Sequence, residues 1–165
     1  PDGRRITSYR KVHLWQEEQL HFAAGDELVM GDIAGVPTGL GICWDVAFPE
    51  WGRAYALRGA ELLLLPTAWD LPTIREYDML VRARALENGV FLIGCNHAGS
   101  DGDIEFGGHS QIVDPRGEVL AFAGDNSETV LIAELDLSEV GRSRALHTPY
   151  FRDRKPAVYD RVRRT

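Results

Sequence analysis

The sequence is poor in cysteine and methionine and has no long hydrophobic run. Only two cysteines and two methionines occur among 165 residues, which excludes a small fold held together by several disulfides. The apolar stretch at residues 62–66, like every other in the sequence, is far shorter than the ~20 residues of a membrane-spanning helix. No charged and then apolar leader opens the chain, and both cysteines have apolar neighbours, as reduced cysteines do. We therefore expect a cytoplasmic protein without a membrane partner.

The charge pattern also excludes some partners. The net charge is −7, from 25 acidic and 18 basic residues, and a globally acidic protein is a poor nucleic-acid binder. Residues 142–165 are different, because they carry eight Arg or Lys and two Asp. Such a basic arm can bind nucleic acid or membrane. Aromatic and aliphatic side chains interrupt these charges, which favours a C-terminal extension that packs on an acidic neighbour, so we expect no nucleic-acid partner.

Length and periodicity predict a single α/β domain over residues 1–165. The composition, 44% hydrophobic and 26% charged, is that of an ordinary globular domain. Four successive leucines from residue 62 are typical of a strand that is covered on both faces. A turn sequence at residues 114–117 predicts a hairpin. We expect strands at residues 6–13, 27–33, 38–43, 61–65, 90–95, 109–113, 118–122 and 129–135. We expect helices from Pro49 to about Gly59, from a Thr73–Glu76 capping box to about Asn88, and at residues 137–146.

Cys43 is the sharpest chemical feature of the sequence. The segment GLGICWDVAFPE at residues 39–50 places this cysteine between an expected strand and an expected helix. Backbone N–H groups at the start of a helix favour a thiolate and can hold an oxyanion. We expect Asp45 and Glu50 to cap that helix, since acidic residues suit a helix N-terminus. The alternative for Cys43 is that it is a small buried residue without a chemical role, as most free cysteines are. For Cys95 this is the simpler interpretation.

A thiol nucleophile also needs a base and a cation. None of the five histidines stands at a spacing that identifies a Cys–His pair. Lys11 lies in the alternating segment YRKVHLW at residues 9–15, and lysines are rarely buried without a partner. Taken alone, Lys11 is more simply a surface residue. We expect no metal and no cofactor, because no Cys/His cluster has metal-ligand spacing and no glycine-rich phosphate loop is present.

Taken together, several segments resemble the motifs of the nitrilase superfamily, the carbon–nitrogen hydrolases. The segments YRKVHL at residues 9–14 and GICWDVAFPE at residues 41–50 are similar to the family's lysine and cysteine motifs. The resemblance continues through RGAELLLLP, RARALEN, GGHS and DPRGEVL, and FRDRKP at residues 151–156 resembles the family's C-terminal extension. It implies an αββα four-layer sandwich, of which this chain would form the C-terminal part.

The resemblance also implies hydrolysis of non-peptide C–N bonds by a Glu–Lys–Cys mechanism. Cys43 would be the nucleophile that forms an acyl-enzyme intermediate. Lys11, helped by the backbone N–H of Trp44, would stabilise the oxyanion. Glu18, with Glu17 in reserve, would orient the substrate. The implied substrates are small amides or carbamoyl compounds, and the alternative is a nitrilase that acts on C≡N groups.

Three further residues are candidates for substrate binding. Trp44 and Trp69 are expected to line a pocket, and Trp69 follows a strand end, where such pockets form. Asn96 is the third candidate, although hydrogen bonding to backbone at a strand end is its simpler interpretation. For both tryptophans plain packing is the alternative.

The sequence departs from the family in one respect. The family's general-base glutamate lies well upstream of the lysine motif, and this sequence has no equivalent of it. We therefore expect the C-terminal portion of an enzyme, inactive as this piece alone unless the missing N-terminal half is supplied. The family also implies a homo-oligomer. A non-catalytic alternative is a fragment that covers its apolar sheet face by assembling with a partner half.

Overall fold

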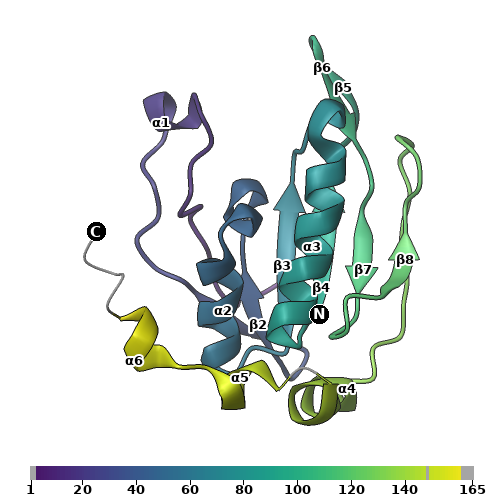
Figure 1. Cartoon of the computed structure of the whole chain (residues 1–165). Coiled ribbons are helices and arrows are strands. Elements are labelled where there is room, and N and C mark those ends of the chain that lie inside the picture. The colour runs from purple at the N-terminus through teal and green to yellow at the C-terminus, as the bar shows by residue number, and fades with distance from the viewer. Residues whose placement is uncertain (1–2, 148, 161–165) are drawn as a thin grey trace.

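The computed structural model describes residues 3–147 and 149–160, which build a mixed six-stranded sheet with two helices on one face (Figure 1). The three central strands, β2, β3 and β4, are parallel, and β1, β7 and β8 pair antiparallel at the two sides. A separate antiparallel hairpin of β5 and β6 projects beyond the sheet (Figure 1). The α/β class is therefore as expected. In sheet order the strands are β1 (Met30–Ile33), β2 (Val36–Leu40), β3 (Leu62–Thr67), β4 (Phe91–Asn96), β7 (Gln111–Val113) and β8 (Val119–Phe122), and the hairpin is β5 (Ala98–Asp101) and β6 (Ile104–Gly107).

Two helices, α2 (Pro49–Leu57) and α3 (Ile74–Asn88), lie on one face of the sheet (Figure 1). Both end as the sequence predicts, because glycines in the left-handed region follow them, Gly59 at φ 94° and Gly89 at φ 54°. Their inner faces share one core with β3 and β4. The largest fully buried side chains of that core include Trp51, Tyr55, Tyr77, Leu63, Leu65 and Leu92.

Glycines let the sheet approach the two helices closely. A Cβ at Gly94 of β4 would lie 2.3 Å from the Tyr77 hydroxyl of α3. A Cβ at Gly41, just after β2, would lie 2.3 Å from the Trp51 ring of α2. The Trp51 indole also donates a hydrogen bond of 3.1 Å to the Leu40 carbonyl. These contacts fix α2 against the end of β2, and thereby fix the segment between them, which contains Cys43.

The remaining elements are short, and the last of them lie along one edge of the domain (Figure 1). Phe151 packs between two guanidinium groups, those of Arg53 at 4.8 Å and Arg144 at 5.2 Å. The basic extension thus packs on the domain, and its Arg142 pairs with Asp136 at 2.7 Å and with Glu139 at 2.6 Å. In the described residues, no helix is long and apolar enough to cross a membrane. The short elements are α1 (Glu18–His21), α4 (Ser138–Arg142), α5 (Tyr150–Asp153), α6 (Pro156–Tyr159), the 3-10 helices η1 (Cys43–Ala47) and η2 (Leu71–Thr73), and the π-helix η3 (Ser143–His147).

Two expected strands do not form. Neither residues 6–13 nor residues 129–135 form a strand, and neither segment belongs to a sheet. The alternating pattern persists in the second segment, where Val130 and Ile132 are 84% and 88% exposed and Leu131 and Ala133 are partly buried. A strand needs a backbone partner as well as a side-chain pattern, and no described strand pairs with either segment.

Two local expectations are also wrong. Thr73 precedes α3 but makes no side-chain cap, because its hydroxyl binds the carboxylate of Asp70 instead. The expected capping box with Glu76 is therefore absent, and Glu76 is available for other contacts. Cys95 is exposed, not buried. Its neighbour Gly94 faces α3, so Cys95 points to the face of the sheet that α2 and α3 do not cover.

Candidate active site

Cys43 starts a 3-10 helix, η1, at the end of the β2 segment. Its φ of 48° is in the left-handed region, which is uncommon for a residue with a Cβ and is concentrated at functional sites. The thiol lies 3.9 Å from the Ala68 carbonyl, just beyond β3. Helix α2 begins only at Pro49, so the cysteine stands at the start of a tight turn and not directly at the N-terminus of that helix.

Asp45 ties the cysteine turn to the segment that carries Lys11. Its carboxylate is fully buried and accepts hydrogen bonds of 3.0 Å from the His13 backbone N–H and 2.9 Å from the Tyr9 hydroxyl. The Nδ1 atom of His13 lies 2.8 Å away, and the Ile42 N–H donates at 2.9 Å. We expected Asp45 to cap α2; it caps its own turn instead. Burial first, and then the neighbouring Asp45 carboxylate, raise the pKa of Tyr9.

This network makes a prediction about stability. In Asp45→Asn an NH2 group replaces one of the two carboxylate oxygens. The buried N–H and O–H groups that now donate to that oxygen would lose their acceptor. We expect a free energy of unfolding lower by about 3 kcal/mol, measured by urea unfolding. Asp26→Asn is a matched control, because Asp26 pairs with Arg10 through side chains that are 83% and 65% exposed. Equal effects of the two substitutions would contradict the role of Asp45.

Lys11 and Glu18 form an ion pair beside the cysteine turn. Lys11 Nζ lies 2.5 Å from Glu18 Oε2, and the two side chains are 9% and 36% exposed. The Trp15 N–H donates to the same oxygen at 2.7 Å. Burial acts to raise the pKa of Glu18, but the hydrogen bonds from Lys11 and Trp15 outweigh it and hold that pKa below its ordinary value. Glu18 is therefore a carboxylate at neutral pH.

A tight loop closure holds this ion pair in place. The Gly25 N–H donates a hydrogen bond of 2.7 Å to the Lys11 carbonyl. A Cβ at Gly25 would lie 2.2 Å from the Arg10 carbonyl oxygen, so only glycine fits. The loop that carries Glu18 is thereby bound back onto the segment that carries Lys11. Glu17, the reserve candidate, is exposed at the N-terminus of α1.

The charges of this pair act on the cysteine. Burial raises the pKa of the Cys43 thiol above its ordinary value. The Lys11 ammonium opposes this rise, and the Glu18 carboxylate adds to it. The thiol is therefore protonated at neutral pH, and a base must take its proton before it attacks a carbonyl carbon.

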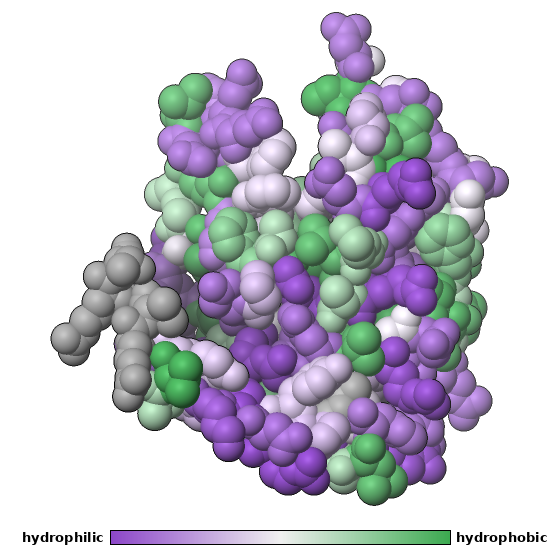
Figure 2. All heavy atoms as spheres, viewed as in Figure 1, coloured by the Kyte–Doolittle hydropathy of each residue, from purple (hydrophilic) through white to green (hydrophobic). Residues whose placement is uncertain are grey.

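Cys43 lines a pocket of about 350 Å³ whose walls are rich in tryptophan. The ring centres of Trp15 and Trp44 are 4.1 Å apart, and those of Trp44 and Trp69 are 5.7 Å apart. The space-filling view shows a notch between the lobe of α1 and the β5–β6 hairpin (Figure 2). Pocket residues come from beside α1, from η1 and from β6, which places the pocket at this notch. Its other lining residues are Gln16, Ala68, Asp70, Thr73, Glu76, Ile104 and Phe106.

Two of the three expected binding residues line the pocket, and the third lies behind its wall. Trp44 and Trp69 line the pocket, and their contact with a substrate stays a prediction. Asn96 is buried behind Trp69: its side-chain oxygen accepts from the Trp69 N–H at 2.7 Å, and its amide donates to the Trp69 carbonyl at 3.3 Å. These contacts favour the structural interpretation of Asn96. The pocket carboxylates of Asp70 and Glu76 were missed, because Glu76 was assigned to a capping box.

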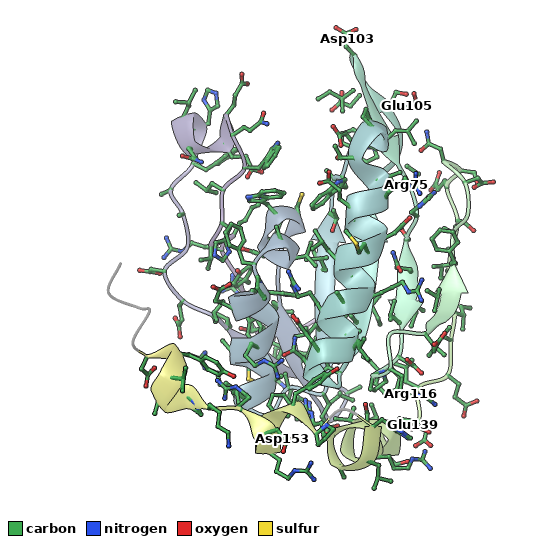
Figure 3. The ribbon with its side chains drawn as sticks, viewed as in Figure 1. Arg75, Asp103, Glu105, Arg116, Glu139 and Asp153 are labelled. Atoms are coloured by element: carbon green, nitrogen blue, oxygen red, sulfur yellow. The ribbon has the colours of Figure 1, made fainter. Side chains whose placement is uncertain are left out.

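A larger open groove of about 580 Å³ on another side of α3 is a poorer candidate. Arg75 and Arg116 lie on this side of the molecule (Figure 3). Among the described residues that line the groove there is no cysteine, serine, threonine or lysine, so the groove offers no thiol, hydroxyl or amine nucleophile. Among the described residues, no group of three or more His, Cys, Asp or Glu side chains could hold a metal ion. The groove is lined by Arg75, Asp78, Met79, Arg82, Ala83, Leu86, Arg116, Gly117 and Glu118.

The structure thus combines a mixed α/β sheet with a cysteine in a pocket and a nearby Lys–Glu ion pair. The family model for carbon-nitrogen hydrolases matches residues 1–145, and the chain belongs to this family. It is 41% identical over 160 residues to the 2-oxoglutaramate amidase of Bacillus subtilis (strain 168), covering 96% of this chain and 61% of that protein. It is 34% identical over 170 residues to omega-amidase NIT2 of Homo sapiens, with coverages of 96% and 61%.

Solved structures show the same likeness. The carbon-nitrogen hydrolase from Helicobacter pylori G27 has a TM-score of 0.93 and 31% identity, over 99% of this chain and 63% of that one. A variant of the amidase from Nesterenkonia sp. AN1, which carries the acetamide moiety of fluoroacetamide covalently added at its active-site cysteine, has a TM-score of 0.82 and 33% identity, over 95% and 56%. These likenesses confirm the expected nitrilase-type α/β fold. The chain spans about three fifths of the length of these relatives.

Proposed function

We propose that the protein hydrolyses a non-peptide C–N bond in a small amide or carbamoyl compound, with Cys43 as the nucleophile. The observation that carries the proposal is the position of Cys43, on a strained turn in a tryptophan-lined pocket and within the field of the Lys11–Glu18 pair. The relatives named as amidases support an amide as the substrate. The Nesterenkonia amidase, with its covalently modified active-site cysteine, supports the covalent route.

In the proposed reaction, the sulfur of Cys43 attacks the amide carbon. A C–S bond forms, and the carbonyl π pair moves to oxygen, where the Lys11 ammonium and the backbone N–H of Trp44 stabilise the negative charge. The C–N bond then breaks as the leaving nitrogen takes the proton that a general base removed from the thiol, which releases ammonia or an amine. Water hydrolyses the thioester, releasing the acid and restoring the thiol. Glu18 holds Lys11 in place and orients the substrate.

Proton transfer in this scheme needs a general base. The family resemblance implies a glutamate for that task, and no residue of this sequence matches it. We therefore propose that the 165 residues alone do not complete the reaction and that a further segment or partner half supplies the base. Assembly as a homo-oligomer is proposed on the same resemblance. The activity tests therefore use the protein together with the segment or partner half that would supply the base.

Butyramide and butyronitrile distinguish the proposed amidase from a nitrilase, because they differ only in the C–N group. We expect ammonia and butyrate from butyramide and no turnover of butyronitrile. A thioester adduct on the peptide that contains Cys43 should appear in intact-protein and peptide mass spectra during turnover. Turnover of the nitrile alone would favour the nitrilase alternative. No turnover and no adduct with either compound would favour the non-catalytic alternative.

A further inference from the structure

A buried arginine of α3, Arg84, reaches the end of the cysteine turn η1. Its side chain is only 8% exposed. Its Nε donates a hydrogen bond of 2.9 Å to the Val46 carbonyl, and its Nη2 donates one of 3.0 Å to the Ala47 carbonyl. The third nitrogen, Nη1, pairs with Glu87 at 3.1 Å, which compensates the buried charge. Arg84 is not among the residues that line the Cys43 pocket, so any effect on the chemistry must pass through the turn.

The two carbonyls at the end of η1 need a donor from outside the turn. Carbonyl groups at the end of a helix have no partner within that helix. In a continuing 3-10 helix the Val46 carbonyl would accept from the residue three positions later, but that residue is Pro49, which has no N–H. A planar guanidinium carries several donors in a fixed arrangement and can bind both carbonyls at once. Arg84 thus completes the hydrogen bonding of the cysteine turn.

The packing of α2 on α3 leaves room for this side chain. A Cβ at Gly52 of α2 would lie 2.8 Å from Nδ2 of Asn88 and 3.6 Å from Cδ of Arg84. Glycine inside a helix is less stable than alanine, and here it lets α2 approach these two side chains of α3 closely. The contact between the two helices therefore directs Arg84 toward the end of η1.

The cysteine turn is held at both ends by buried charged side chains. Before the cysteine, the Asp45 carboxylate accepts a hydrogen bond of 2.9 Å from the Ile42 N–H. After it, Arg84 binds the last two carbonyls of η1. Cys43 lies between these anchors at a φ of 48°. An uncommon backbone conformation costs free energy and persists only where the surrounding contacts enforce it.

We propose that Arg84 is a positioning residue for the nucleophile. By holding the end of η1, it keeps Cys43 in the left-handed conformation and keeps the sulfur where it attacks the substrate. This inference rests on the proposed function, because it concerns the nucleophile of the same reaction. A displacement of about 1 Å, caused by a change far from the chemistry, can cost about 10²-fold in rate. Binding of the substrate depends less on the sulfur than bond formation does, so the effect should fall on kcat and not on KM.

Arg84→Met tests the inference in the assembly that includes the general base. Methionine donates no hydrogen bond, so the two carbonyls lose their donor. We expect kcat for butyramide to fall about 10²-fold, with KM within about threefold of the wild-type value. Arg84→Lys keeps the positive charge but not the planar group, and its kcat should lie between those of Arg84→Met and the wild type. If Arg84→Met does not fold, Arg84→Lys alone carries the test.

Hydrogen exchange, followed by peptide mass spectrometry, reports on the turn without any turnover. The N–H groups of Asp45 and Phe48 close η1 through hydrogen bonds of 3.1 and 3.2 Å. Exchange of such groups is limited by local opening of the backbone. In both Arg84 variants, the peptide that contains the two groups should therefore exchange faster than in the wild type.

Arg144→Met is the matched control. Arg144 is partly buried and also donates to two backbone carbonyls, those of Asn88 and Ala60, but neither belongs to the cysteine turn. We expect a lower free energy of unfolding, with kcat within about twofold of the wild-type value and unchanged exchange in the η1 peptide.

Unchanged kcat and unchanged exchange in the Arg84 variants would overturn the inference. An equal loss of kcat in Arg144→Met would also overturn it, because the effect would then follow from lost stability and not from the turn. Absence of turnover in the wild type would instead overturn the proposed function. The exchange comparison would in that case still decide whether Arg84 holds the cysteine turn.

Discussion

Replacing Cys43 by alanine should abolish amide hydrolysis. In the proposed reaction every bond change passes through this sulfur, and loss of a covalent nucleophile typically costs several orders of magnitude in kcat. We expect kcat for butyramide to fall at least about 10⁴-fold. The fold should be retained, because the change removes one atom at a partly buried site and leaves the core of α2 and α3 intact. Ammonia release under single-turnover and steady-state conditions measures the loss.

Cys95→Ala is the control for this experiment. It removes the other thiol of the described chain, which is exposed on the sheet face turned away from α2 and α3. We expect kcat to stay within about twofold of the wild-type value, as for a surface substitution. Wild-type turnover by Cys43→Ala, or loss of turnover in Cys95→Ala alone, would show that the nucleophile has been assigned to the wrong residue.

The second large effect is expected from Lys11→Met. Methionine has a similar length but no charge, so the oxyanion would lose one of its stabilising groups, which is worth about 10²–10³ in kcat. The substitution should also change the pH dependence of Cys43. Lys11 lowers the pKa of this thiol and Glu18 raises it, so removing the ammonium raises that pKa further. The thiolate is the reacting form, and its fraction at any given pH therefore falls.

Alkylation by iodoacetamide measures this shift without any turnover. The rate at the Cys43 peptide should rise with pH, and in Lys11→Met the whole profile should move to higher pH. Arg10→Met is the matched control, since it removes a positive charge one residue away, from a side chain that is 65% exposed. Its profile should overlay that of the wild type. An unshifted profile in Lys11→Met would mean that Lys11 does not act on Cys43.

Local patterns were enough to predict the elements that position the site. The sequence itself marks the start of helix α2 at Pro49 and its end before Gly59. The successive leucines of β3 likewise indicate a strand that is buried on both faces. The segments at residues 6–13 and 129–135 alternate equally well, yet neither forms a strand. Strand pairing depends on a neighbouring backbone, which a single segment does not reveal.

In the candidate site, too, some features could be predicted from the sequence and others could not. Cys43, Lys11 and Glu18 were named because they stand in motifs that resemble those of a family, and the structure brings the three into one electrostatic environment. The contacts of Asp45 with Tyr9 and His13 could not be predicted, because more than thirty residues separate the partners in sequence. From the sequence alone, a polar residue near the start of a helix can either cap that helix or line a nearby pocket. Only the packed structure distinguishes these two roles.

The arrangement of the tryptophans has an optical consequence. Three of the four in the chain, Trp15, Trp44 and Trp69, line the Cys43 pocket, whereas Trp51 is 1% exposed in the core. Indole emission responds to the polarity of its surroundings, so a molecule that displaces water from this pocket should change the fluorescence of the whole protein. Ligand binding can therefore be followed by light emission from unlabelled protein, even in variants that lack the sulfur of Cys43.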